Sequence, residues 1–260
     1  GMGGAGNGIG LQNDIVSPYF IAYCTDEQKD RWWPGIASGE KILAIAMTEP
    51  GAGSDLQGVK TSAVKDGNHY KINGSKTFIT NGQHANLILV AAKTNPDEKA
   101  KGMSLVILET DGADGFTRGR KLEKIGMKSA DTSELFFDNI PIPPENILGG
   151  EEGQGFYQMM KQLPQERLII GCGAVGAMEG AVARTIDYCK ERQAFGASIL
   201  TFQNTSRNMF NLYSVTQQST VTRPKYQVAP QVGEDKNRKF CIVHATSQYF
   251  VKQQHNISHL

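Results

Sequence analysis

Residues 69–82 read HYKINGSKTFITNG, and this stretch has the pattern that decides the fold of the whole middle of the chain. Two short runs rich in β-branched and aromatic residues, His69–Ile72 and Lys76–Ile79, are each followed by Asn-Gly or by Thr-Asn-Gly. Asn-Gly beside apolar runs favours a tight hairpin turn, because both central residues must adopt positive φ. We therefore expect two strands here, each ending in a turn.

The same pattern continues from Lys41 to about Leu148. Further runs of this kind are Ile42–Met47, Val59–Val64, Asn86–Ala92, Met103–Leu108 and Glu134–Phe137. Turn-forming pairs such as Pro50-Gly51, Asp66-Gly67 and Asp111-Gly112 separate them. Repeated short strands without intervening helices predict an antiparallel sandwich or barrel.

Helical patterns flank this β region. Before it, Thr25 and Gln28 fit a capping box, Pro34 is expected to stop or kink the helix, and Gly39 is expected to end it. After it, apolar residues recur at helical spacing from Phe156, Pro164 interrupts them, and a longer helix is expected from Glu166 to about Arg192. The predicted organisation is therefore helical over 1–40, β over 41–148 and helical over 149–205.

Residues 206–260 are polar, contain Pro224 and Pro230, and keep neither a helical nor a strand period. We expect the first half of this tail to be loop or disordered, with at most one short element near Phe240–Val251.

Composition excludes several classes. The chain has 260 residues and a formal net charge of +1, without the basic excess of a nucleic-acid-binding protein. Its apolar runs fall far short of the roughly 20 residues that span a bilayer, and we expect no signal peptide and no membrane span. The four cysteines form no CxxC pair, so they are expected to be reduced thiols. An intracellular soluble enzyme or binding module is the expectation.

Two polar segments could contact a ligand. Met47–Asp55 follows a strand and displays hydroxyls and backbone N–H groups that can bind a heteroaromatic edge or a phosphate, although an ordinary capped turn explains the composition equally well. In the second segment, Phe78 could stack on a flat ligand while Thr80 donates to it. Taken alone, that segment is explained better by a plain hairpin.

Three further patterns favour structural explanations. Glu166 with Arg167 at the expected helix start could be a general base beside a cationic neighbour, but a solvated ion pair near the helix dipole is the simpler interpretation. Gly171, Gly173 and Gly176 match G-x-G-x-x-G without a preceding strand, so helix packing explains them better than dinucleotide binding. His255 and His259 lack a third ligand, and no metal site is predicted.

Taken together, these segments resemble the acyl-CoA dehydrogenase family. The resemblance is carried, in order and over roughly residues 8–205, by AMTEPGAGSD (46–55), NGSKTFITNG (73–82), GRKLEKIGMK (119–128), SELFF (133–137), LPQERL (163–168) and ERQAFG (191–196). LPQERL and residues 119–137 look most like the long-chain branch. Compared with a complete family member, the chain lacks the opening part and departs after Thr205.

The resemblance implies an α+β fold: a helical N-terminal part, a β-barrel or sandwich middle domain and a truncated helical C-terminal part, assembled as a homodimer or homotetramer. The implied activity is FAD-dependent α,β-desaturation of a long-chain acyl-CoA, with electrons passed to an electron-transfer flavoprotein. A catalytically inactive flavin- or acyl-CoA-binding fragment is the alternative. The implied location is the cytoplasm in a bacterium and the mitochondrial matrix in a eukaryote.

The resemblance also assigns residues. The implied FAD contacts are Met47, Thr48, Gly53, Ser54, Phe78, Ile79, Thr80, Arg192 and Gln203, the last two reaching the FAD of a neighbouring subunit. Ser54 and Arg167 would lie on the acyl-CoA side. Most family members carry the catalytic base later in the chain, but the long-chain and isovaleryl branches place it at the position of Glu166. An apolar acyl cleft would raise the pKa of that carboxyl, which would bring it closer to the pKa of the α-proton that it must accept.

Overall fold

The computed structural model describes residue 6 and residues 8–221, with side chains to Gln217. The expected element near Phe240–Val251 and the pair His255 and His259 lie outside these residues. The N-terminal helices are η1 (Leu11–Val16), α2 (Ser17–Tyr23) and α3 (Asp26–Ser38). The strands of the middle region are β1 (Leu43–Ala46), β2 (Ser62–Asp66), β3 (His69–Thr80), β4 (Leu87–Lys93), β5 (Met103–Glu109), β6 (Phe116–Lys121) and β7 (Thr132–Ile142).

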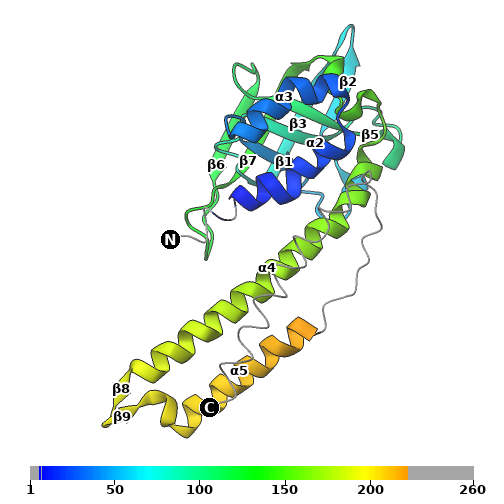
Figure 1. The fold of residues 1–260 in the computed structure, drawn as a ribbon. Helices are drawn as coiled ribbons and strands as arrows, with labels where there is room; N and C mark the ends of the chain where they lie inside the picture. Colours follow the sequence, from blue (N-terminus) through cyan, green and yellow to red (C-terminus); the bar gives the residue numbers. More distant parts are fainter. Residues whose placement is uncertain (1–5, 7, 222–260) are drawn as a thin grey trace. The chain divides into compact units, whose positions relative to one another are not determined.

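The C-terminal part consists of α4 (Gly155–Glu191), a small hairpin of β8 (Gln193–Ala194) and β9 (Ala197–Ser198), and α5 (Gln203–Val221). Single 3-10 turns connect the longer elements: η2 (Leu56–Gly58), η3 (Ala100–Gly102), η4 (Pro144–Asn146), η5 (Leu148–Gly150) and η6 (Ile199–Thr201). The α+β class and the order of helices, sheet and helices are as predicted (Figure 1).

The seven strands form one curled sheet in the order β1-β4-β2-β3-β7-β6, with β5 paired to the remaining edge of β4. The sheet is mixed, because β1 and β2 both pair with β4 in parallel. The expectation of a purely antiparallel arrangement was wrong at these two pairings. The long polar segment after β1 is the physical reason, since only a tight turn forces consecutive strands to be antiparallel neighbours.

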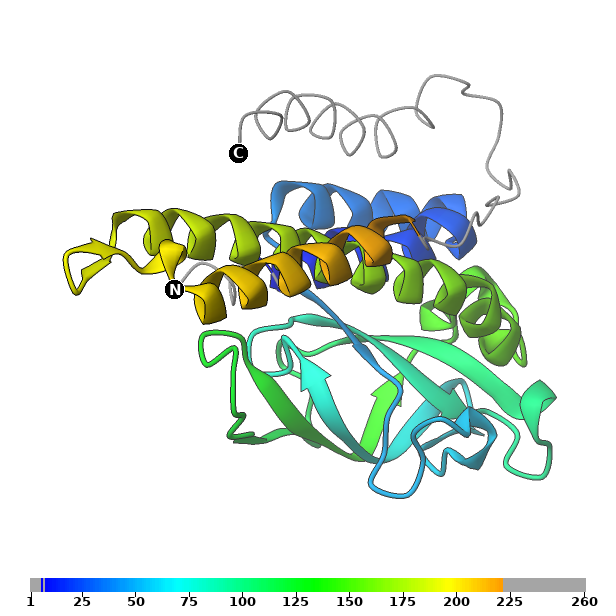
Figure 2. The same cartoon turned by 90° about the horizontal axis from the view of Figure 1, so that it is seen from below.

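The strands β4 and β5 are buried on both faces. Leu87, Leu89 and Ala91 of β4 join a cluster with the N-terminal helices, which lie across that face of the sheet (Figure 2). Ile88 and Val90, which alternate with them, join the second cluster, enclosed by the curled sheet. Burial on both faces explains why these strands are continuous apolar runs rather than alternating ones.

The strand β3 continues through Asn73-Gly74, where we expected a hairpin turn. Gly74 has φ of +147°, and the pairing with β7 shifts its register between Ile72 and Gly74. A Cβ at Gly74 would lie 2.8 Å from the Cα of Thr61, so this glycine permits a close backbone approach. The expected turn at Asp66-Gly67 is correct, because Asp66 pairs with His69 across Gly67, which has φ of +61°.

The sequence did not predict β6. This strand reads FTRGRK and pairs only with β7, at the edge of the sheet. Charged side chains are typical of edge strands because they oppose pairing with another chain, and they also remove the hydrophobic alternation that would reveal the strand.

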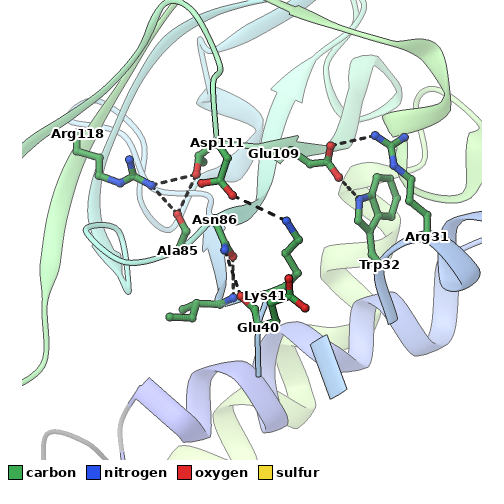
Figure 3. A network of polar contacts seen from close by, with 11 residues as sticks. Arg31, Trp32, Glu40, Lys41, Ala85, Asn86, Glu109, Asp111 and Arg118 are labelled. Carbon is green, nitrogen blue, oxygen red and sulfur yellow. Dashed lines mark hydrogen bonds and ion pairs between the residues drawn. The ribbon is translucent and has the colours of Figure 1, made fainter. Parts of the chain in front are cut away.

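The helix α3 begins at the predicted capping box, since the side chain of Thr25 accepts from the N–H of Gln28 and that of Gln28 accepts in return. It ends at Gly39 in a left-handed conformation, but it continues through Pro34. Polar contacts attach the helix α3 to the sheet (Figure 3). There Glu109 accepts from the Trp32 indole at 2.5 Å and from Arg31 at 3.0 Å.

The helix α4 is continuous from Gly155 to Glu191 and includes Pro164, where we expected an interruption. Glu166 therefore lies about three turns inside a helix and not at its start, and the helix-dipole argument does not apply to it. The predicted loop from Ser206 was also wrong as far as Val221, because α5 covers these residues. Polar side chains hid that helix from a pattern based on apolar spacing.

Gly171, Gly173 and Gly176 all lie inside α4, which excludes a strand-turn-helix nucleotide site. Within the described part of the chain no atom approaches the position of an added Cβ at any of them, so no packed partner helix is seen there. By length and composition alone α4 could cross a membrane. Core helices of soluble proteins share this property, so it assigns no membrane role, and the absence of a membrane span stays a prediction.

Candidate functional site

The polar segment Met47–Asp55 is a closed turn that projects from the end of β1. Glu49 and Ala52 exchange two backbone hydrogen bonds of 2.9 and 3.2 Å. Ala52 is buried, while Gly53 and Ser54, which follow the turn, are exposed. A closed turn and an exposed hydroxyl are thus both present. An ordinary structural turn and a ligand-contacting segment are therefore compatible explanations of these residues.

A buried ion pair fixes this turn to β3. The Lys76 ammonium, whose side chain is 0% exposed, lies 2.9 Å from Glu49 Oε1 and donates to the backbone oxygen of Met47 at 3.0 Å. Next to it, the N–H of Thr77 donates to the backbone oxygen of Thr48 at 2.9 Å. The two polar segments that the sequence singled out are therefore held together through their own residues.

Glu49 is satisfied on both oxygens. Oε1 also accepts from the N–H of Thr61 at 2.9 Å, and Oε2 accepts from the N–H of Lys60 at 2.8 Å. Burial alone would raise the pKa of Glu49, but these hydrogen bonds and the Lys76 charge outweigh it, and the pKa lies below its usual range. Burial lowers the pKa of Lys76 to about 8, although Glu49 opposes this shift. Both groups are charged at neutral pH.

The end of β3 presents an aromatic ring to the outside. Phe78 has φ of +60°, lies at a register shift between Lys76 and Ile79, and is 67% exposed. Positive φ is costly for a bulky residue and persists only where the surrounding structure enforces it. Ile79 beside it is 2% exposed in the sheet core, so only its backbone is available to a ligand.

Three hydroxyl side chains at these strand ends are available for a ligand. Thr48 and Thr80 are half-buried, Ser54 is exposed, and none of the three side chains has a hydrogen-bond partner among residues 8–217. An exposed aromatic face beside unpaired hydroxyls matches the chemistry of a flat heterocycle with polar edges. The donor set therefore fits the isoalloxazine ring of a flavin.

Glu166 lies on the face of α4 that meets α2. Its Oε1 accepts a hydrogen bond of 2.7 Å from the phenol of Tyr19, which is 0% exposed. Burial raises the pKa of Glu166, and the Tyr19 hydrogen bond and the Arg167 charge oppose the shift. Arg167 itself is exposed and makes no ion pair within the described residues. The interpretation of Glu166 and Arg167 as a simple surface ion pair is therefore not supported.

One hydrophobic cluster connects the strand ends to the surroundings of Glu166. Met47 at the end of β1 and Leu163, one turn before Glu166, both pack against the cluster that contains Tyr19 and Phe20. Asn81, directly after β3, donates to the backbone oxygens of Leu43 and Gly8 at 3.1 and 3.4 Å. The N-terminal helices thus contact both the β3 end and α4.

Arg192 and Gln203 lie at the other end of α4. Arg192 is the C-terminal cap of that helix and its backbone oxygen accepts from Ile199 at 2.9 Å, while Gln203 begins α5. At about 1.5 Å per residue, the 25 positions between Glu166 and Glu191 span roughly 38 Å. Figure 1 shows the β8–β9 hairpin and the start of α5 at the end of α4 that is remote from the sheet, so the structure does not bring Arg192 and Gln203 together with the other predicted cofactor residues of the same chain.

Sequence reasoning missed three residues of this arrangement. Glu49 and Lys76 stand inside the two quoted segments, but their pairing is visible only when β3 lies beside the turn. Tyr19 belongs to the helix SPYFIAY, where nothing in the pattern distinguishes it from an ordinary core aromatic. Within the described residues no group of three or more histidine, cysteine, aspartate or glutamate side chains could hold a metal ion.

The fold is that of an α+β protein with a curled sheet between helical parts, and the candidate ligand-contacting residues lie at two strand ends. Comparison with known proteins gives the family. The family described as "Acyl-CoA dehydrogenase, middle domain" matches residues 44–140, and "Acyl-CoA dehydrogenase, C-terminal domain" matches residues 153–229, together about two thirds of the chain. The chain belongs to the acyl-CoA dehydrogenase family. The second match extends beyond Thr205, where the sequence resemblance had been expected to end.

Individual relatives agree with this assignment. The chain is 47% identical over 209 residues to "Long-chain specific acyl-CoA dehydrogenase, mitochondrial" of Sus scrofa, covering 80% of this chain and 48% of that protein. It is 38% identical to "Isovaleryl-CoA dehydrogenase, mitochondrial" of Pongo abelii, covering 82% and 50%. An acyl-CoA dehydrogenase structure from Geobacillus kaustophilus superposes with a TM-score of 0.79 at 50% identity, covering 83% of this chain and 57% of that one. The chain spans about half the length of the curated relatives it matches.

Proposed function

We propose that this chain carries the flavin-contacting and proton-abstracting parts of an FAD-dependent acyl-CoA dehydrogenase that acts on long-chain acyl-CoA thioesters. The observation that carries the proposal is the half-buried Glu166, with a raised pKa and a buried phenol as its partner. The similarity to long-chain enzymes supports the substrate class.

The residues that would hold FAD are those at the two strand ends. Phe78 would face the ring, and Thr48 and Thr80 would hydrogen-bond to its polar edge. The backbone of Met47, Gly53 and Ile79 and the side chain of Ser54 would complete the contact. When bound, FAD supplies a hydride acceptor for the β-carbon of the substrate.

Glu166 would take the α-proton of the acyl thioester on a carboxylate oxygen. A carboxyl with a raised pKa is a better match for this proton than an ordinary surface glutamate. Arg167 is exposed beside it and would lie on the side of the CoA, and Ser54 would contact both substrate and cofactor. General-base catalysis by a positioned carboxylate contributes about 10²–10⁴-fold to the rate.

A second copy of the chain would complete the cofactor site. Arg192 lies roughly 38 Å along α4 from Glu166, and Gln203 begins α5 after the hairpin that follows Arg192, so both would reach the FAD of a neighbouring subunit in a homodimer or homotetramer. We further propose that an electron-transfer flavoprotein reoxidises the flavin. The names of the eukaryotic relatives support a mitochondrial location for a eukaryotic chain, and the cytoplasm is proposed for a bacterial one.

The test is reduction of the bound flavin by a long-chain acyl-CoA, followed by stopped-flow absorbance. Glu166→Gln should retain FAD and acyl-CoA but lower the reduction rate by about 10²–10⁴-fold. Asp187→Asn is the matched control, because Asp187 is an exposed carboxylate on the same helix. Reduction of the Gln variant at the parent rate would refute the assignment of the base. A parent chain that binds FAD but is not reduced would identify it as a non-catalytic flavin-binding fragment.

A further inference from the structure

The hydrogen bond between Tyr19 and Glu166 joins two parts of the chain that are 147 residues apart. The phenol oxygen lies 2.7 Å from Glu166 Oε1, and Tyr19 is 0% exposed. Among the described residues the phenol makes no other hydrogen bond. A buried hydroxyl that donates only to a carboxylate is unusual in a purely hydrophobic cluster, because phenylalanine would fill the same space without a polar atom.

Packing fixes the position of this phenol. Tyr19 lies on α2 beside Tyr23, with ring centroids 6.2 Å apart and planes at 58°. The Tyr23 hydroxyl donates to the backbone oxygen of Gln158 on α4 at 3.4 Å, so a second tyrosine attaches the same two helices. Met159 and Leu163, on the same face of α4 as Glu166, belong to or pack against the cluster that contains Tyr19.

The contact with Tyr19 makes the two carboxylate oxygens of Glu166 different from each other. Oε1 accepts from Tyr19, whereas Oε2 accepts no hydrogen bond within the described residues. Burial and the neighbouring Glu166 charge raise the pKa of Tyr19, so the phenol stays a donor throughout the physiological pH range. The charged or titratable groups that face Glu166 are Tyr19 from α2 and Arg167 from α4.

We infer that Tyr19 is a positioning residue for the base: its phenol holds Oε1 of Glu166 and favours the ionised carboxylate, leaving Oε2 to receive the proton. The inference rests on the proposed function, because it gives Tyr19 a role only if Glu166 is the base. A hydrogen bond to the charged form of a carboxyl opposes the effect of burial. Loss of the phenol should therefore make Glu166 harder to ionise.

The first experiment measures the ionisation of Glu166 directly in the full chain. Protein labelled with ¹³C at the glutamate side-chain carboxyl is titrated by NMR, and the Glu166 resonance is identified by its absence in Glu166→Gln. Tyr19→Phe should raise the pKa of Glu166 by about one unit, as expected for the loss of one charge-assisted hydrogen bond. Tyr23→Phe is the matched control, since its hydroxyl contacts a backbone oxygen instead, and it should leave this pKa unchanged.

An unshifted Glu166 pKa in Tyr19→Phe, or equal shifts in both tyrosine variants, would overturn the inference. A second measurement needs no variant and therefore does not depend on folding of Tyr19→Phe. In the parent chain labelled with ¹³C at tyrosine Cζ, the chemical shift of Tyr19 should change with pH at the pKa of Glu166, while the chemical shift of Tyr23 should not. A Tyr19 resonance that ignores Glu166 ionisation would also overturn the inference.

The role in catalysis is read from the pH profile of flavin reduction. In Tyr19→Phe the acid limb should move to higher pH by about the same one unit, with the rate at high pH approaching that of the parent. If the acid limb of Tyr19→Phe is not shifted while Glu166→Gln is slow, the role of Tyr19 is refuted and the assignment of the base is not. Parent-rate reduction in Glu166→Gln would instead refute the proposed base, so the two failures are distinguishable.

Discussion

Removing the charge of Lys76 tests how the two segments that we propose to contact the flavin are held together. In Lys76→Met, Glu49 keeps its hydrogen bonds from the N–H groups of Lys60 and Thr61 but loses its counter-charge in a buried site. Breaking a buried ion pair by removing one partner costs about 3–5 kcal/mol, because the remaining charge is left uncompensated. For a folded unit of this size that corresponds to a fall in Tm of about 6–20 °C.

The control lies on the same strand. Lys71 of β3 contacts Asp66 at 2.6 Å, but the two side chains are 43% and 53% exposed. Lys71→Met should cost no more than about 1 kcal/mol, as is usual for exposed pairs. The assay is thermal and urea unfolding of the parent, the single variants Lys76→Met, Lys71→Met and Glu49→Gln, and the double variant Glu49→Gln/Lys76→Met. The double variant should be less destabilised than the sum of its single substitutions, because the two side chains interact directly.

The same series should affect FAD. Lys76 also donates to the backbone oxygen of Met47, so its loss should loosen the turn that carries Thr48 and weaken flavin retention, whereas Lys71→Met should not. If Lys76→Met and Lys71→Met unfold within about 1 kcal/mol of each other, the pair does not stabilise the site and our reasoning about it is wrong.

Three further substitutions test individual features of the site. Thr48→Ala and Thr80→Ala should each weaken FAD binding by about 2- to 12-fold, which is the effect of one neutral hydrogen bond. Thr117→Ala, on the exposed edge strand, is the control and should not weaken it. Unchanged FAD titrations in both Thr48→Ala and Thr80→Ala would contradict the proposed contacts. Phe78→Gly should raise the free energy of unfolding by about 0.5–1 kcal/mol by relieving the positive φ, yet weaken FAD retention; lower stability would show that Phe78 is not strained. Because the raised pKa of Glu166 means that the folded chain keeps a proton that the unfolded chain releases, parent stability should fall as pH rises from 4.5 through the folded pKa. Glu166→Gln should remove this loss, and thermal unfolding should show it more stable than the parent at pH 8 but not near pH 4.

The sequence by itself determined the elements whose causes are local. The capping box at Thr25, the left-handed end at Gly39 and the turn at Gly67 depend on a few neighbouring residues, and all were predictable. The apolar runs Asn86–Ala92 and Met103–Leu108 predicted the strands β4 and β5. The sequence also identified the family, because several short motifs keep their order and spacing along the chain.

Only the tertiary structure decided which of these segments meet. Gly74 looked like a turn residue, but it lies inside the continuous strand β3, where the backbone of Thr61, the residue before β2, approaches it closely. Pro164 looked like a helix break, yet α4 continues through it, and Glu166 consequently lies inside a helix and faces Tyr19. Neither the pairing of Glu49 with Lys76 nor that of Tyr19 with Glu166 leaves a local signal. Contacts between residues 27 and 147 positions apart arise from packing of separate elements, and no local pattern encodes them.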